Sequence, residues 1–225
     1  MIRLLLLLTL VLSPMVTNLH ADEEGNLKQV MNDLRTGELV KKRKALTQII
    51  AMKTAARSTA PLVASLLEKD RDVLVRRSAA EALGVIGADS KMTIAALSKA
   101  MKDTDTEVIA RASTSISKYG KDAVPVLRQA LAEKDNQVRK YAADALASIG
   151  PDAKEAVPDL LKAYQAEGPN MRRGNNIRAA YVIALGNIGP DAKEAIPVFE
   201  AFLKERNPDR ELRRVVTEAM RKINK

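Results

Sequence analysis

The sequence has 225 residues and a formal net charge of +9; 46% of it is hydrophobic and 3% aromatic, with one histidine, no cysteine and no tryptophan. The histidine, His20, lies in a segment that we expect to be removed, so the mature chain has no histidine or cysteine ligand for zinc or copper. It also has no His-based triad, thiol nucleophile or disulfide, and we expect neither catalysis nor a cofactor. Because aromatic residues are so few, small aliphatic residues must fill the core, which favours closely packed helices over a β-sandwich or barrel.

Residues 1–21 have the pattern of a secretory signal peptide. Arg3 is their only charged residue, an apolar run follows over residues 4–12, and Ala21 stands just before an acidic cluster. The run is shorter than the roughly 20 residues that a spanning helix needs. We therefore expect cleavage near Ala21 and a mature domain of residues 22–225 with no stable membrane span, located in the periplasm or secreted. An uncleaved N-terminal anchor is the alternative.

A helical pattern that ends in glycine recurs along the mature chain. In each copy, the positions 12, 8, 5, 4 and 1 before the glycine are mostly apolar or small, which places them on one face of an α-helix. Lys53 and Asn224 take the place of the glycine in the first and last copies. The anchors are 30 to 39 residues apart, a period typical of α-solenoids, and those with glycine are Gly87, Gly120, Gly150 and Gly189.

A second helical pattern lies between successive anchors. Pro61, Pro158 and Pro197 each follow an anchor by eight residues, near the start of such a pattern, where a helix tolerates proline. Each unit is thus two antiparallel helices with short turns, and we predict an all-α fold: a right-handed α-solenoid of about six helical hairpins. The predicted first helices of these hairpins cover residues 60–69, 93–102, 123–133, 155–165 and 194–204.

The repeated segment resembles the HEAT repeat, in the bacterial subgroup named for phycobilin lyases. Residues 72–87 read Asp-Val-Leu-Val-Arg-Arg-Ser-Ala-Ala-Glu-Ala-Leu-Gly-Val-Ile-Gly and match the family pattern nearly throughout, as does Asp135–Gly150. Residues 103–120 depart from it with Ile109 in the place of the arginine, and residues 26–53 match loosely, as a terminal repeat should. The resemblance is informative about the fold and hardly about a substrate.

The resemblance also implies a ladder of charged side chains that links neighbouring units. In such repeats an aspartate near the helix start and an arginine four positions later form the rungs, and the aspartate can also accept hydrogen bonds from the first amides of its helix. We expect this role to be structural, because it recurs with the repeat. The residues are Asp72 and Arg76, Asp135 and Arg139, and Asp209 and Arg213.

Two basic segments are candidates for partner binding. A basic run, formed by Lys41, Lys42, Arg43 and Lys44, has no carboxylate after it until Glu68. It could contact an anionic lipid headgroup, a polysaccharide or nucleic acid, or it could simply be a charged edge of the solenoid. Residues 166–176 are an insertion that accounts for the longest spacing, and repeat proteins often vary their binding in such loops. This insertion carries Arg172 and Arg173, which we expect to be locally unpaired.

These features favour a non-catalytic exported scaffold that binds a protein partner on the surface of the solenoid. The alternative is a binder of an anionic envelope or extracellular polymer, through Lys41–Lys44, Arg111 and Arg172–Arg173. We do not expect nucleic acid as the partner, because the two phenylalanines lie at core spacing and no tryptophan is available for stacking. An enzyme that uses carboxylates remains a third reading, for which the sequence offers no recognisable constellation.

Overall fold

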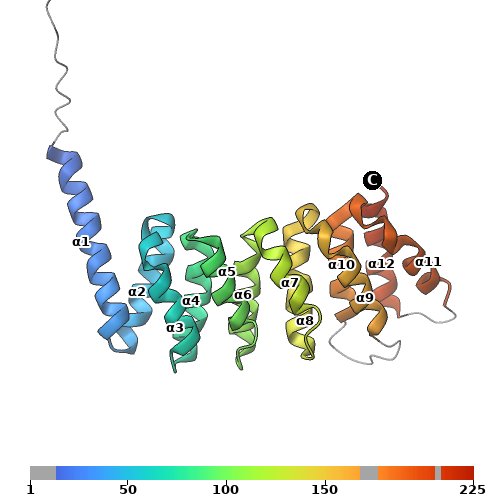
Figure 1. Ribbon diagram of the computed structural model, residues 1–225, viewed down its shortest axis with the longest axis horizontal. Coiled ribbons are helices and arrows are strands. Elements are labelled where there is room, and N and C mark those ends of the chain that lie inside the picture. The colour runs from blue at the N-terminus through green and yellow to red at the C-terminus, as the bar shows by residue number, and fades with distance from the viewer. Residues whose placement is uncertain (1–13, 168–176, 206–208) are drawn as a thin grey trace, which may run out of the picture.

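The computed structural model describes residues 14–167, 177–205 and 209–225, and every regular element in these ranges is helical. Within these ranges, twelve α-helices form one elongated stack, with α1 at one end and the hairpin of α11 and α12 at the other (Figure 1). Their bounds are α1 Pro14–Thr36, α2 Leu39–Met52, α3 Ala60–Lys69, α4 Val73–Ile86, α5 Ser90–Ala100, α6 Thr106–Ser117, α7 Val124–Ala130, α8 Asn136–Ile149, α9 Val157–Ala166, α10 Ile177–Ile188, α11 Ile196–Leu203 and α12 Arg210–Ile223.

The helices form six consecutive hairpins, α1/α2 to α11/α12, and the predicted all-α solenoid is confirmed. Each second helix packs against the second helix of the next hairpin, so that α2, α4, α6, α8, α10 and α12 make one continuous row. The first helices pack less closely on one another, and α7 in particular has little contact with α9. The second helices therefore form the more closely packed side of the stack, here called the inner row.

The expected glycine anchors do end the second helices in most hairpins. Gly87, Gly120, Gly150 and Gly189 all have positive φ, between 53° and 79°, a conformation that a residue without Cβ adopts readily. Lys53, predicted from the register alone to take the same place after α2, also has a positive φ of 51°. Four 3₁₀ segments lead from these turns into the next hairpins: η1 Lys53–Thr59, η2 Gly120–Ala123, η3 Gly150–Ala156 and η4 Gly189–Ala195.

Aspartates start the second helices. The side chains of Asp72, Asp105, Asp135 and Asp209 each accept a hydrogen bond from a backbone amide two or three residues on, at 2.7 to 3.0 Å. These bonds satisfy amides that have no partner inside the helix. The repeated aspartate therefore has a capping role in the fold, as its place near the helix start predicted.

Small residues let neighbouring second helices approach closely. A Cβ built on Gly186 of α10 would lie 2.8 Å from the Cβ of Ala219 in α12, so a side chain there would push the two helices apart. The repeated small residue five before each anchor is buried in the same way, and Ala82, Ala145 and Ala184 are each 0% to 1% exposed. The core is thus one continuous layer between the repeats, because no single hairpin can bury its apolar stripe alone.

The cleavage expected near Ala21 falls inside α1. The side chains with which α1 enters the core, Val30 and Leu34, are each 1% exposed and lie beyond that point. Cleavage would therefore leave the packed part of α1 in place as the cap of the first hairpin. None of the helices within the described ranges is long and apolar enough to cross a lipid bilayer.

Candidate functional site

Among the side chains described from residue 25 onward, the large exposed hydrophobic ones all lie on the inner row. Four large hydrophobic residues stand out there: Val40 is 76% exposed, and Leu39, Leu74 and Ile183 are 40% to 42% exposed. All four lie on second helices, α2, α4 and α10. A single exposed apolar residue needs no explanation. Because all four lie on the same row of helices, that row is the candidate surface for binding a partner.

Ion pairs join the inner helices α2 and α4 to the hairpin that follows each of them. In each case, two adjacent basic residues on an inner helix pair with two aspartates in the turn of the next hairpin. These two aspartates are two residues apart in the sequence. Arg76 donates to Asp103 at 2.8 and 3.0 Å, and Arg77 donates to Asp105 at 2.8 and 2.7 Å. One hairpin earlier, the equivalent pairs are Lys42 with Asp70 at 2.7 Å and Arg43 with Asp72 at 3.2 Å.

This ladder links neighbouring units through partners that the family resemblance did not specify. Arg76 and Arg139 do not use the carboxylates four residues before them as their ion-pair partners; they reach Asp103 and Glu167 of the following units. Arg213 donates instead to the carbonyl of Leu203. The reason is geometric: Asp72, Asp135 and Asp209 turn their carboxylates toward the amides of their own helix starts, whereas a long arginine side chain extends into the next turn.

One rung of the ladder is missing between α6 and the next hairpin. The positions on α6 equivalent to Arg76 and Arg77 are Ile109 and Ala110. Neither side chain is charged, so neither can form an ion pair with the turn before α8. In that turn, Glu133 pairs with Lys102 of the preceding unit at 2.6 Å, and Asp135 caps α8. The substitution of the arginine by Ile109, visible in the sequence, thus removes a link that its neighbours keep.

Acid is expected to weaken the fold partly through this ladder. The hydrogen bonds from Arg77 lower the pKa of Asp105 from 3.8 to about 2. Between these two values the unfolded chain binds more protons than the folded one, so the stabilisation present above pH 4 is lost as the pH falls toward 2. We expect the urea midpoint of Arg77→Gln to fall less between pH 4 and pH 2 than that of the wild type. Equal losses would contradict this role, and Arg213→Gln, whose arginine reaches a backbone carbonyl, is the control.

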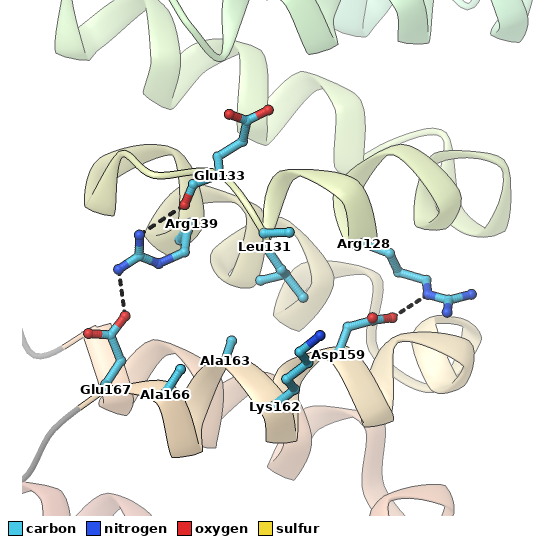
Figure 2. A pocket seen from close by; sticks show the side chains of 10 residues that line it. Arg128, Leu131, Glu133, Arg139, Asp159, Lys162, Ala163, Ala166 and Glu167 are labelled. Atoms are coloured by element: carbon cyan, nitrogen blue, oxygen red, sulfur yellow. Dashed lines mark hydrogen bonds and ion pairs between the residues drawn. The ribbon is translucent and has the colours of Figure 1, made fainter.

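A cavity of about 460 Å³ opens on the outer side, between the first helices α7 and α9 (Figure 2). The cavity follows from the unequal lengths of the two helices, since α7 has seven residues and α9 has ten. A turn, and not a further helical segment, therefore packs beside the C-terminal half of α9 and leaves this space. Leu131 and Ala163 give the cavity an apolar wall, and Lys162 lines it as well. The other lining residues are Arg128, Ala132, Glu133, Arg139, Asp159, Ala166 and Glu167.

The charges around this cavity balance. Arg128 pairs with Asp159 at 2.5 Å, and Arg139 pairs with Glu167 at 2.6 Å (Figure 2). With Glu133 and Lys162 included, three cations face three carboxylates. Because its two arginines already have carboxylate partners, the cavity offers no concentrated charge to a ligand. Its arrangement is that of a seam between two hairpins, held at each end by an ion pair.

Arg139 is the centre of this seam. Its guanidinium donates to Glu167, to the hydroxyl of Tyr181 at 3.2 Å, and to the backbone carbonyls of Glu133 and Lys134 at 2.9 and 3.0 Å. The side chains of Arg139 and Glu167 are 17% and 8% exposed. A single side chain therefore ties together the turn before α8, the end of α9 and the middle of α10. The sequence suggested a structural role for Arg139, but not these partners.

The predicted partner-binding residues divide into three groups. Lys41 and Lys44 are exposed, whereas Lys42 and Arg43 are partly buried and hold the next hairpin through the ladder. Arg111 forms ion pairs with Glu107, four residues before it at 2.8 Å, and with Glu81 of the preceding hairpin. The inserted loop residues Arg172 and Arg173 lie outside the described residues.

A family profile described as HEAT repeats matches residues 28–116 and 94–175, together about two thirds of the chain. The chain belongs to the HEAT-repeat family. A comparison with curated proteins found no match.

Solved structures of repeat proteins have the same fold. A designed armadillo repeat protein in complex with the peptide (KR)4 aligns over 88% of this chain and 99% of its own, with a TM-score of 0.55 and 18% identity. An engineered protein aligns over 88% and 96%, with a TM-score of 0.55 and 20% identity. A chain from the complex of CpcE and CpcF of phycocyanin lyase from Nostoc sp. PCC7120 aligns over 73% of this HEAT-repeat chain and 65% of its own, with a TM-score of 0.56 and 27% identity.

Proposed function

We propose that this HEAT-repeat protein is an exported, non-catalytic scaffold that binds a partner protein on its inner row. The observation that carries the proposal is the location of the exposed apolar side chains: Leu39, Val40, Leu74 and Ile183 all lie on second helices. Protein interfaces combine apolar anchors with a polar rim, and the inner row offers this combination. Tyr141 and Arg111, of residue types enriched in such interfaces, lie on the inner helices between them.

A protein partner fits this surface better than an anionic polymer. A polymer binder needs a series of cations free to contact successive anionic groups. On the inner row, however, Lys42, Arg43 and Arg111 already have carboxylate partners within the chain. Their charge is largely neutralised, so this surface would recognise a partner mainly through its shape and its apolar contacts. Polymer binding remains the second candidate through the two exposed residues, Lys41 and Lys44.

The comparisons and the N-terminal segment support the remaining parts of the proposal. The designed armadillo protein of similar fold was solved with a bound peptide, which illustrates how such a surface is used. The similar chain from a phycocyanin lyase does not extend lyase activity to this one, because the mature chain has no cysteine or histidine for covalent chemistry. Export rests on residues 1–21, and a tagged protein recovered from the cytoplasm at full length would contradict it.

The test is affinity capture from the envelope and medium of the native host, using the C-terminally tagged protein. We expect a defined protein to stay bound in high salt, because apolar interfaces depend little on ionic strength. Ile183→Asp should reduce its recovery at least tenfold, since a charge would then occupy a contact surface. Ala201→Asp places the same charge on the outer helix α11, where Ala201 is exposed, and should leave recovery unchanged. Anionic material alone, lost in high salt, would overturn the proposal in favour of polymer binding.

A further inference from the structure

The largest apolar exposure in the described residues lies at the N-terminal end of the inner row. Val40 and Leu74 occupy the same position in successive repeats, thirteen residues before the anchors Lys53 and Gly87, and their helices α2 and α4 pack together. With Leu39, which is 40% exposed, they form what we call the N-terminal patch. Val40 itself is 76% exposed, although valine is a residue that folded proteins usually bury.

The fold does not require apolar residues at this position. In three later repeats the equivalent residues are polar: Glu107 on α6, Gln137 on α8 and Glu211 on α12. Their side chains are partly or fully exposed. Because the same backbone position accepts glutamate and glutamine elsewhere in this chain, the valine and leucine of the first two repeats are not explained by packing. Their exposure is a property of this end of the solenoid.

The charges beside the patch are positive and available. Lys41 and Lys44 are exposed, and neither has an ion pair within the described part of the chain, in contrast to Lys42 and Arg43 between them. The one carboxylate beside them on this stretch is Glu38, which is exposed and leaves the amides at the start of α2 without a side-chain cap. Two free cations therefore stand against one carboxylate next to the apolar surface.

We propose that the N-terminal patch docks a segment of the partner protein that carries aliphatic side chains flanked by carboxylates. The aliphatic groups would cover Val40 and Leu74, and the carboxylates would pair with Lys41 and Lys44. This inference rests on the proposed function and specifies the chemistry of the partner. An anionic lipid surface fits less well, because the exposed carboxylate of Glu38, beside Lys41, would face its anionic headgroups.

Site-specific photo-crosslinking in the native host tests this proposal. The full-length protein would carry p-benzoylphenylalanine at one of three positions: Val40 in the patch, Ile183 elsewhere on the inner row, or Ala201 on the outer side as a control. We expect Val40 to crosslink to one protein, within a peptide that combines leucine, isoleucine or valine with at least two acidic residues. A lipid or polysaccharide adduct at Val40, or a crosslinked peptide that is basic or lacks aliphatic residues, would overturn it.

The three positions separate this inference from the proposed function. A protein adduct at Ile183 without one at Val40 keeps the scaffold and removes the N-terminal docking site, whereas no protein adduct at either position contradicts both. The crosslinked peptide, synthesised and labelled, then serves as the probe for binding in solution. Lys41→Glu with Lys44→Glu should weaken its binding at least tenfold. The control pair Lys121→Glu with Lys154→Glu, at exposed residues of η2 and η3, should change its binding less than twofold.

Discussion

Replacement of Ala145 by aspartate is expected to abolish the cooperative unfolding of the central repeats. Ala145 lies on α8 and is 1% exposed, at the position five before the anchor where a small residue lets the next second helix approach. An aspartate there has no room and no cationic partner in the core, and its ionised form is very costly to bury. A loss of about 4 kcal/mol or more is typical of such changes, against a total stability of about 5–15 kcal/mol for a domain.

Circular dichroism during thermal unfolding measures this effect, and hydrogen exchange locates it. We expect α8 and its neighbours α6 and α10, against which it packs, to lose protection first, because each repeat is stabilised by the interfaces on both sides. Ala201→Asp is the matched control: it makes the same chemical change at an exposed position of α11 and should retain a single transition. A wild-type transition for Ala145→Asp would show that the assigned register of the core is wrong.

The second large effect is expected at Arg139. Arg139→Met keeps most of the volume of the side chain but removes every donor that joins Glu167, Tyr181 and the turn before α8. The carboxylate of Glu167, 8% exposed, would then be buried without its partner. Breaking such a pair from one side destabilises a protein by about 3–5 kcal/mol, and we expect the free energy of unfolding in urea to fall by about 3 kcal/mol.

Double-mutant cycles distinguish the partners of Arg139. Arg139→Met and Glu167→Gln should be strongly non-additive, because the second change removes the charge that the first leaves unpaired. Arg139→Met and Asp135→Asn should be additive, because Asp135 caps its own helix rather than pairing with Arg139. The reverse outcome would restore the ladder implied by the family resemblance. Arg213→Met, at the equivalent position of the last repeat, is exposed and should have a small effect.

The sequence alone was sufficient for the architecture, because the signals that specify it are local. The register of apolar and small residues relative to each anchor defined the second helices, and it placed Lys53 at a turn that the structure shows with positive φ. Capping by Asp72, Asp135 and Asp209 was also predictable, since a helix start and its cap lie within three residues of each other. Because each hairpin is specified by such short-range patterns, the overall architecture depends little on contacts between residues far apart in the sequence.

The tertiary structure alone decided which charges are available. The partners of Lys42, Arg43 and Arg76 lie 27 to 29 residues further along the chain, in the turn of the next repeat, so no local spacing identifies them. The basic run at Lys41–Lys44, one patch in the sequence, thus contains two residues with a structural role, Lys42 and Arg43, and two that are available for binding, Lys41 and Lys44. Likewise, the cavity between α7 and α9 depends on how a short helix stacks on a longer one. Pairing across repeats is a property of the stack, because each partner is brought into reach by packing and not by its own sequence neighbourhood.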